Sequence, residues 1–128
     1  MIEVEALHNV SISVTELGRA KQFYGDVLGL REIHRPAFDF AGAWYQVGDR
    51  QLHLIVHPGT RTLRKTTEID TRDGHYGLRV RSYRQTLEHL DARGVAYRDK
   101  PRNRTPWPQI YVTDPDGNVI ELNAERID

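Results

Sequence analysis

The fold is decided by residues 7–30, which read LHNVSISVTELGRAKQFYGDVLGL. The first part of this stretch alternates apolar and polar residues, as in a strand that buries one face. In the second part, apolar side chains recur at helical spacing, and these are Leu17, Ala20, Phe23, Tyr24, Val27 and Leu28. Thr15 is the expected N-cap of this helix and Gly29 its expected end. The stretch therefore predicts a strand followed by an amphipathic helix.

A second stretch, residues 74–95, repeats this pattern with the sequence GHYGLRVRSYRQTLEHLDARGV. A His opens each strand-like run, and a Gly ends each helix. Gly29 lies 29 − 8 = 21 residues after His8, and Gly94 lies 94 − 75 = 19 residues after His75. Because the two halves keep step so closely, they predict two copies of one folding unit.

Each half continues with three short strand-like segments. They are 31–34, 43–47 and 51–56 in the first half, and 96–98, 110–113 and 118–123 in the second. Residues 57–74 are rich in Gly, Thr and charge, which predicts a linker. Each half therefore reads β-α-β-β-β. We expect one α+β domain over residues 1–128, with modules at 5–57 and 73–123.

The composition argues against several classes of protein. The 18 Lys and Arg residues balance 18 Asp and Glu residues, whereas proteins dedicated to nucleic acid or membrane surfaces usually have a basic excess. The chain has no Cys, which excludes disulfides and thiolate nucleophiles. Neither a secretory signal pattern nor an apolar stretch of membrane-spanning length is present, so we expect a soluble, cytoplasmic protein.

A carboxylate interrupts the last strand-like segment, although strands are depleted in Glu and an unpaired buried carboxylate is costly. Glu121 lies 121 − 75 = 46 residues after His75, and His53 lies 53 − 8 = 45 residues after His8. These offsets predict that His8 and His75 share one repeated position, and that His53 and Glu121 share another. Imidazole and carboxylate ligands together suit zinc, nickel, cobalt or ferrous iron. The sequence thus predicts a divalent metal site.

Two segments, 35–44 and 98–111, mix arginines with aromatic residues. The candidate substrate-binding residues in them are Arg35, Trp44, Arg102, Arg104, Trp107 and Tyr111. Arginine beside aromatic rings suits an anionic, partly apolar small molecule. Solvated loops with ordinary exposed charge are the alternative. A nucleic-acid partner is not expected, because no aromatic and basic strand motif accompanies these charges.

These motifs resemble the vicinal oxygen chelate superfamily, which includes glyoxalase I, extradiol dioxygenases, methylmalonyl-CoA epimerase, and fosfomycin and bleomycin resistance proteins. LGRAKQFYGDVLGL resembles the first helix of that family, and DPDGNVIEL resembles its final turn and strand. RPAFDFAGAWYQVGDRQLHLI resembles a glyoxalase-I-like subgroup. The resemblance covers nearly the whole chain. It implies tandem βαβββ modules whose strands form an open, curved, mixed sheet around a cleft, with flanking helices, and it implies a homodimer.

The resemblance also implies that His8, His53, His75 and Glu121 bind one divalent metal ion, which would be Zn, Ni, Co, Mn or Fe(II). Glyoxalase I usually has Glu where this chain has His53. Glu121 is then the only carboxylate left at the metal positions to act as the catalytic base.

The implied function is a metal-dependent, glyoxalase-like enzyme of the lyase or isomerase type, similar to lactoylglutathione lyase. Its substrate would be a small molecule with vicinal oxygens. One alternative is an Fe(II) extradiol-type dioxygenase that uses His8, His75 and Glu121, since two His and one carboxylate suit iron. Another alternative is a non-enzymatic protein that sequesters a small molecule, as bleomycin resistance proteins do.

Overall fold

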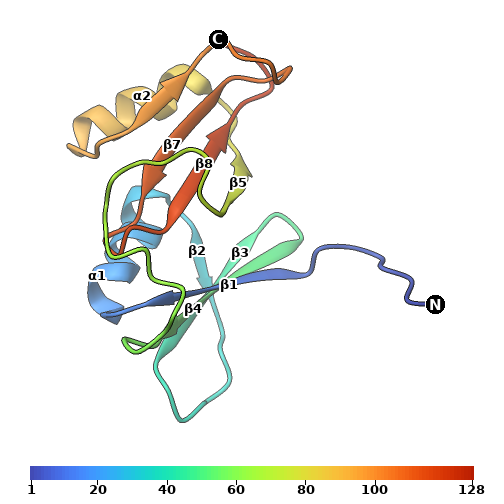
Figure 1. Ribbon diagram of the computed structural model, residues 1–128, viewed down its shortest axis with the longest axis vertical. Helices are drawn as coiled ribbons and strands as arrows, with labels where there is room; N and C mark the ends of the chain where they lie inside the picture. Colours follow the sequence, from blue (N-terminus) through green and yellow to red (C-terminus); the bar gives the residue numbers. More distant parts are fainter. The chain divides into compact units, whose positions relative to one another are not determined.

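A computed structural model describes all residues, 1–128, and the chain divides into two compact units, residues 1–63 and 64–128. Each unit contains one open, mixed, four-stranded sheet and its own helical segment (Figure 1). The α+β class and the doubled β-α-β-β-β order predicted from the sequence are therefore confirmed. No helix has both the length and the apolar character needed to cross a membrane.

The first unit holds four strands and a two-part helical segment. In chain order these are β1 (Asn9–Val14), α1 (Leu17–Lys21), the π-helical η1 (Gln22–Val27), β2 (Arg31–Ile33), β3 (Gly42–Val47) and β4 (Arg50–Val56). The strand order is β1-β4-β3-β2, and only the β1–β4 pair is parallel. One face of the sheet and the helical segment supply the core, which consists of Val14, Ala20, Phe23, Tyr24, Ala43, Tyr45, Leu52 and Leu54.

The first helix begins one residue later than the sequence predicts. Glu16, not Thr15, is its N-cap, and the Glu16 carboxylate accepts hydrogen bonds from the backbone N–H groups of Gly18 and Arg19, both at 2.8 Å. A carboxylate that accepts two N–H groups satisfies more of the unpaired first turn than a single hydroxyl does. Gly29, with φ of +70°, ends the helical segment as predicted.

The second unit repeats the arrangement. Its elements are β5 (His75–Arg79), α2 (Tyr83–Ala92), β6 (Arg98–Lys100), β7 (Gln109–Thr113) and β8 (Val119–Asn123). The strand order is β5-β8-β7-β6, with β5 parallel to β8, and Figure 1 shows the three longer strands side by side. Ser82 caps α2, because its hydroxyl oxygen accepts a hydrogen bond from the backbone N–H of Gln85. The Tyr83 hydroxyl donates to Asp99 at 3.1 Å and ties α2 to β6.

Part of the segment predicted as a linker is anchored on the second unit by Arg64. Its Nε donates to Asp73 at 2.6 Å, and its two Nη groups donate to the carbonyl oxygens of Gly117 at 2.7 Å and Glu68 at 2.8 Å. The Arg64 side chain is only 15% exposed. Arg64 therefore fixes the chain just before β5 and joins it to the turn that leads into β8.

Gly117 closes that turn with φ of +86°, and a Cβ at this position would lie 1.8 Å from the carbonyl oxygen of Thr66. Gly117→Ala should lower the free energy of unfolding by about 2 kcal/mol or more, because it adds both backbone strain and a clash. Urea denaturation measures this change. In the control, Gly25→Ala, a Cβ meets no atom within 4 Å. Equal stability of the two variants would contradict the prediction.

Candidate functional site

The second unit has one polar sheet face, centred on Glu121. Successive strand residues point to opposite faces, and cross-strand partners share a face. Glu121 on β8 is paired with Gly77 on β5 and with Tyr111 on β7. By the same register, this face also carries His75, Arg79, Gln109 and Asn123. The opposite face carries the buried apolar residues Ile110, Val112, Ile120 and Leu122.

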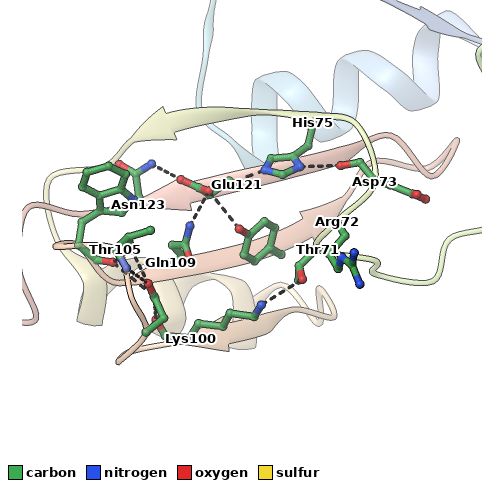
Figure 2. Close-up of polar contacts among 12 residues, drawn as sticks. Thr71, Arg72, Asp73, His75, Lys100, Thr105, Gln109, Glu121 and Asn123 are labelled. Atoms are coloured by element: carbon green, nitrogen blue, oxygen red, sulfur yellow. Dashed lines mark hydrogen bonds and ion pairs between the residues drawn. The ribbon is translucent and has the colours of Figure 1, made fainter.

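The Glu121 carboxylate is buried, with 8% of the residue exposed, and both of its oxygens accept hydrogen bonds. Oε1 accepts from Gln109 Nε2 at 2.8 Å and from the Tyr111 hydroxyl at 3.1 Å, and Oε2 accepts from Asn123 Nδ2 (Figure 2). All three donors are neutral groups. Burial, followed by the charge of Glu121, raises the pKa of Tyr111 to about 12, so the hydroxyl keeps its proton.

His75 approaches the same carboxylate from β5. Its Nε2 lies 3.8 Å from Glu121 Oε1, and its Nδ1 lies 2.7 Å from the carbonyl oxygen of Asp73 (Figure 2). A carbonyl oxygen can only accept, so Nδ1 carries a hydrogen and Nε2 is the ring nitrogen that faces Glu121. A histidine held this way by a backbone carbonyl has the orientation of a typical metal ligand.

Gly77 leaves room for this arrangement on the neighbouring strand. A Cβ at Gly77 would lie 3.3 Å from both Glu121 Oε2 and Asn123 Nδ2. Asn123 is held in turn, because its Oδ1 accepts from Arg79 Nε at 2.6 Å. Arg79 is thus linked to Glu121 by hydrogen bonds through Asn123.

In the first unit, His53 occupies the sheet position that Glu121 occupies in the second. His53 on β4 is paired with Ser11 on β1 and Trp44 on β3. Its ring stacks on Trp44, with centroids 4.0 Å apart and planes 7° from parallel, and its Nε2 lies 2.8 Å from Gln51 Oε1. Burial lowers the pKa of His53, and the positive charges of His8 and Arg35 lower it further. This favours the neutral ring, which is the form that binds metals.

The strand registers correct one prediction. Ser11 pairs with His53 as Gly77 pairs with Glu121, so the equivalence of His53 and Glu121 is confirmed. Two residues before Ser11 stands Asn9, and two residues before Gly77 stands His75. The residue equivalent to His75 is therefore Asn9 and not His8. Counting residues from each His to the later ligand gave the wrong equivalence, because the count includes loops whose lengths differ between the two halves.

His8 itself lies one residue before β1 and is exposed. Its Nδ1 accepts a hydrogen bond from Asn9 Nδ2 at 2.9 Å. Its charge is near enough to lower the pKa of His53, so the two rings of this unit are electrostatic neighbours. Whether His8 binds a metal stays a prediction.

The candidate substrate residues differ in their surroundings. Arg102 and Arg104 are exposed in the segment between β6 and β7. Trp107 is half-buried, with the Arg79 guanidinium 6.0 Å from its ring, and its indole N–H is buried without a hydrogen-bond partner. Tyr111 is buried against Glu121, and its ring meets His75 edge-on at 5.3 Å. Arg35 and Trp44 lie in an aromatic cluster of the first unit.

Sequence reasoning missed the residues that hold the candidate ligands, namely Gln51, Asp73, Gln109 and Asn123. Three of them carried a signal. Gln51, Gln109 and Asn123 each stand two residues from a chosen candidate on the same strand, which is the spacing of side chains on one face. Asp73 acts through its backbone carbonyl and leaves no signal in its side chain.

Neither unit by itself gathers three His, Asp or Glu side chains in a position to hold a metal ion. The second unit offers the pair His75 and Glu121, and the first offers the imidazoles of His8 and His53. Since zinc sites use three or four protein ligands, a complete site needs ligands beyond either pair.

The fold and these residue types define the class of the protein. Residues 6–122 match the model of the Glyoxalase/Bleomycin resistance protein/Dioxygenase superfamily. The chain therefore belongs to this superfamily, as its sequence motifs predicted. It is also similar to Glyoxylase I 4 of Arabidopsis thaliana, with 28% identity over 124 residues that cover 94% of this chain and 71% of the relative.

Solved structures share the fold. One is a mutant of the fosfomycin resistance protein FosX from Listeria monocytogenes, complexed with Mn(II) and 1S,2S-dihydroxypropylphosphonic acid. Its TM-score is 0.73 at 17% identity, covering 95% of this chain and 93% of that one. Another is TnmS3, an antibiotic binding protein from Streptomyces sp. CB03234. Its TM-score is 0.74 at 24% identity, covering 97% and 98%.

Tyr111→Phe should lower the free energy of unfolding by about 1.5 kcal/mol, because the buried carboxylate of Glu121 loses one of its three donors. Urea denaturation measures the change. The control is Tyr97→Phe, which removes a hydroxyl that bonds Asp91, a surface residue. A surface change of this kind is expected to stay within about 0.5 kcal/mol. If both variants lose the same amount, the Tyr111 hydroxyl has no special role.

Proposed function

We propose that the chain is a metal-dependent, glyoxalase-like enzyme of the lyase or isomerase type, acting on a small substrate whose adjacent oxygens are held at one divalent metal ion. The ligand candidates are His8, His53, His75 and Glu121. The superfamily membership supports the class of chemistry, and the surroundings of His75 and Glu121 support the metal. The homodimer implied by the sequence resemblance stays a prediction.

A buried carboxylate that has no Lys or Arg partner and faces an imidazole nitrogen carries this proposal. Glu121 accepts three hydrogen bonds from neutral donors, and no Lys or Arg side chain forms an ion pair with it. The one cationic candidate is His75, whose Nε2 lone pair faces the carboxylate at 3.8 Å when the ring is neutral. A carboxylate and an imidazole lone pair repel each other unless a proton or a metal ion lies between them. A divalent ion bound by both groups removes the conflict.

The ligand set fits a borderline divalent ion. Imidazole suits zinc, nickel, cobalt, manganese and ferrous iron in combination with a carboxylate oxygen. Such an ion, when bound, polarises the substrate oxygens and stabilises the negative charge that develops on them. The Mn(II) in the FosX complex supports this type of ion for the fold.

The remaining chemistry belongs to the side chains of the chain. Glu121 is the one carboxylate among the four candidates, so it is the proposed base for the proton next to a substrate carbonyl. Tyr111 and Gln109 keep its Oε1 aimed, and Asn123 holds its Oε2. Arg35, Trp44, Arg102, Arg104 and Trp107 are the proposed contacts for the substrate.

One observation favours a second candidate function, a non-enzymatic protein that sequesters a small molecule. Asn9 stands at the position equivalent to His75, so the repeated ligand pattern lacks one imidazole. A weakened metal site with intact binding surfaces suits sequestration. The structural likeness to the antibiotic binding protein TnmS3 is consistent with this alternative.

Glu121→Gln tests the enzyme. The substitution keeps the shape of the side chain but removes its charge and basicity. It should weaken the binding of Mn²⁺ or Zn²⁺ by at least about 10-fold and abolish metal-dependent turnover of a glutathione hemithioacetal. Calorimetric titration of EDTA-treated protein and a coupled absorbance assay measure the two effects. His34→Gln, an exposed histidine outside the candidate set, is the control. Wild-type protein that binds no divalent metal would refute the proposed function.

His53→Ala decides the number of ligands. If His53 binds the metal directly, its removal should weaken metal affinity by at least about 10-fold. Unchanged metal affinity would refute the four-ligand site and favour the three ligands His8, His75 and Glu121, the set proposed for an iron dioxygenase. Gln46→Ala is the matched control, because Gln46 lies on the same sheet face and its side chain donates to the backbone carbonyl oxygens of Gly48 and Arg50, not to a predicted ligand.

A further inference from the structure

The first unit carries a row of aromatic rings that begins at His53. The rings of His53 and Trp44 stack at 4.0 Å, Trp44 and Phe38 lie 6.2 Å apart, and Phe38 and Phe40 lie 5.2 Å apart with planes 21° from parallel. We call Phe38, Phe40, Trp44 and Arg35 the aromatic platform. The row of rings thus runs from the exposed Phe38 and Phe40 to His53, a candidate metal ligand of the same unit.

Two rings of the platform, Phe38 and Phe40, are exposed to solvent. Phe38 is 45% exposed and Phe40 is 42% exposed, whereas Phe23, the third Phe of the chain, is 6% exposed. Single exposed apolar residues need no explanation, but two exposed aromatic rings that contact each other form a contiguous apolar patch, which is a candidate binding surface. The stacked pair offers flat apolar area at a low cost in conformational entropy, because its rings already order each other.

Arg35 adds a positive charge to this surface. Its guanidinium carbon lies 4.8 Å from the Phe38 ring centroid and 5.1 Å from that of Phe40, and its Nη2 donates to the Phe40 carbonyl at 2.8 Å. Arg35 forms no ion pair, even with the neighbouring exposed Asp39. A Cβ at Gly42 would lie 2.3 Å from the Leu54 carbonyl oxygen and 3.0 Å from two Arg35 nitrogens, so the guanidinium packs against the backbone of β3. The charge is fixed in place and has no carboxylate partner.

We propose that the aromatic platform binds a planar aromatic carboxylate, with its ring stacked on Phe38 and Phe40 and its anionic group paired with Arg35. Aromatic faces prefer offset stacking, and a guanidinium pairs with carboxylates in a fixed plane. The substrate of the proposed enzyme would carry this aromatic carboxylate in addition to its adjacent oxygens. The inference rests on the proposed function only in calling the bound molecule a substrate. An apolar anion without a ring lacks the stacking, and a neutral arene lacks the ion pair.

The test is an NMR titration of the EDTA-treated, full-length chain with 2-naphthoate, 2-naphthylmethanol and cyclohexanecarboxylate. We expect 2-naphthoate to bind at least about 10-fold more tightly than either of the others, since each lacks one interaction worth about that factor. Its ring protons should shift upfield through stacking, and the amide signals of residues 35–44 should move. Arg35→Gln should weaken 2-naphthoate binding by about 10-fold and leave 2-naphthylmethanol unchanged. Phe38→Leu should weaken both ligands.

Arg31→Gln is the matched control, because Arg31 is an exposed arginine on β2 of the same unit outside the platform. Equal binding of all three ligands, or equal losses in Arg35→Gln and Arg31→Gln, would overturn the inference. The inference would also be overturned if the wild-type protein did not bind 2-naphthoate and Phe38→Leu changed its oligomeric state. The rings would then form a protein interface. Because the titration is metal-free, it is independent of the metal experiments. If the protein binds 2-naphthoate but no divalent metal, only the proposed function is refuted. If it binds a divalent metal but no 2-naphthoate, only this inference is refuted.

Discussion

A carboxylate buried in the middle of a sheet is the constraint on which the candidate site depends. Taking Glu121 out of water costs several kcal/mol unless polar groups or a cation replace the lost solvent. Because β8 is an inner strand of the order β5-β8-β7-β6, the replacements must come from its two neighbours and from its own face. Gly77 leaves space on one side, Tyr111 donates from the other, and Gln109 and Asn123 complete the set. The residue types around Glu121 follow from its burial.

At the same sheet positions, the first unit carries an imidazole in place of the buried carboxylate. His53, Trp44 and Ser11 stand where Glu121, Tyr111 and Gly77 stand in the second unit. A neutral imidazole needs fewer hydrogen-bond partners than a carboxylate, so the Trp44 indole that stacks on it and one acceptor, the Gln51 amide oxygen, hold it in place. The aromatic side chain on the third strand has different tasks in the two units. Tyr111 orders a charge through its hydroxyl, and Trp44 orders a ring through its face.

The elements of the fold could be predicted from the sequence because their signals are local. Alternation, helical spacing and turn glycines predicted each strand and helix, with small errors such as β6, expected at 96–98 and found at Arg98–Lys100. Glu121 was singled out because its residue type conflicts with its strand. Its donors Gln109 and Asn123 were not singled out, and Tyr111 was chosen as a substrate contact, because strand register is needed to place β7 beside Glu121. The same limit produced the mismatch of His8 with His75, since counting residues along the chain does not reproduce register.

The hydrogen bonds of Glu121 also limit what it can do. A carboxylate has about four lone-pair sites, and three of them are engaged by Gln109, Tyr111 and Asn123. One site remains, which can hold a metal ion or receive a proton from a substrate. Glu121 can therefore be ligand and base in the same turnover only if a neutral donor releases an oxygen. Gln109 and Asn123 are the candidates for that release, because the Tyr111 ring is also held by its contact with the His75 ring. Catalysis at this site would thus be coupled to the movement of an amide side chain, whereas metal binding alone would need no such movement.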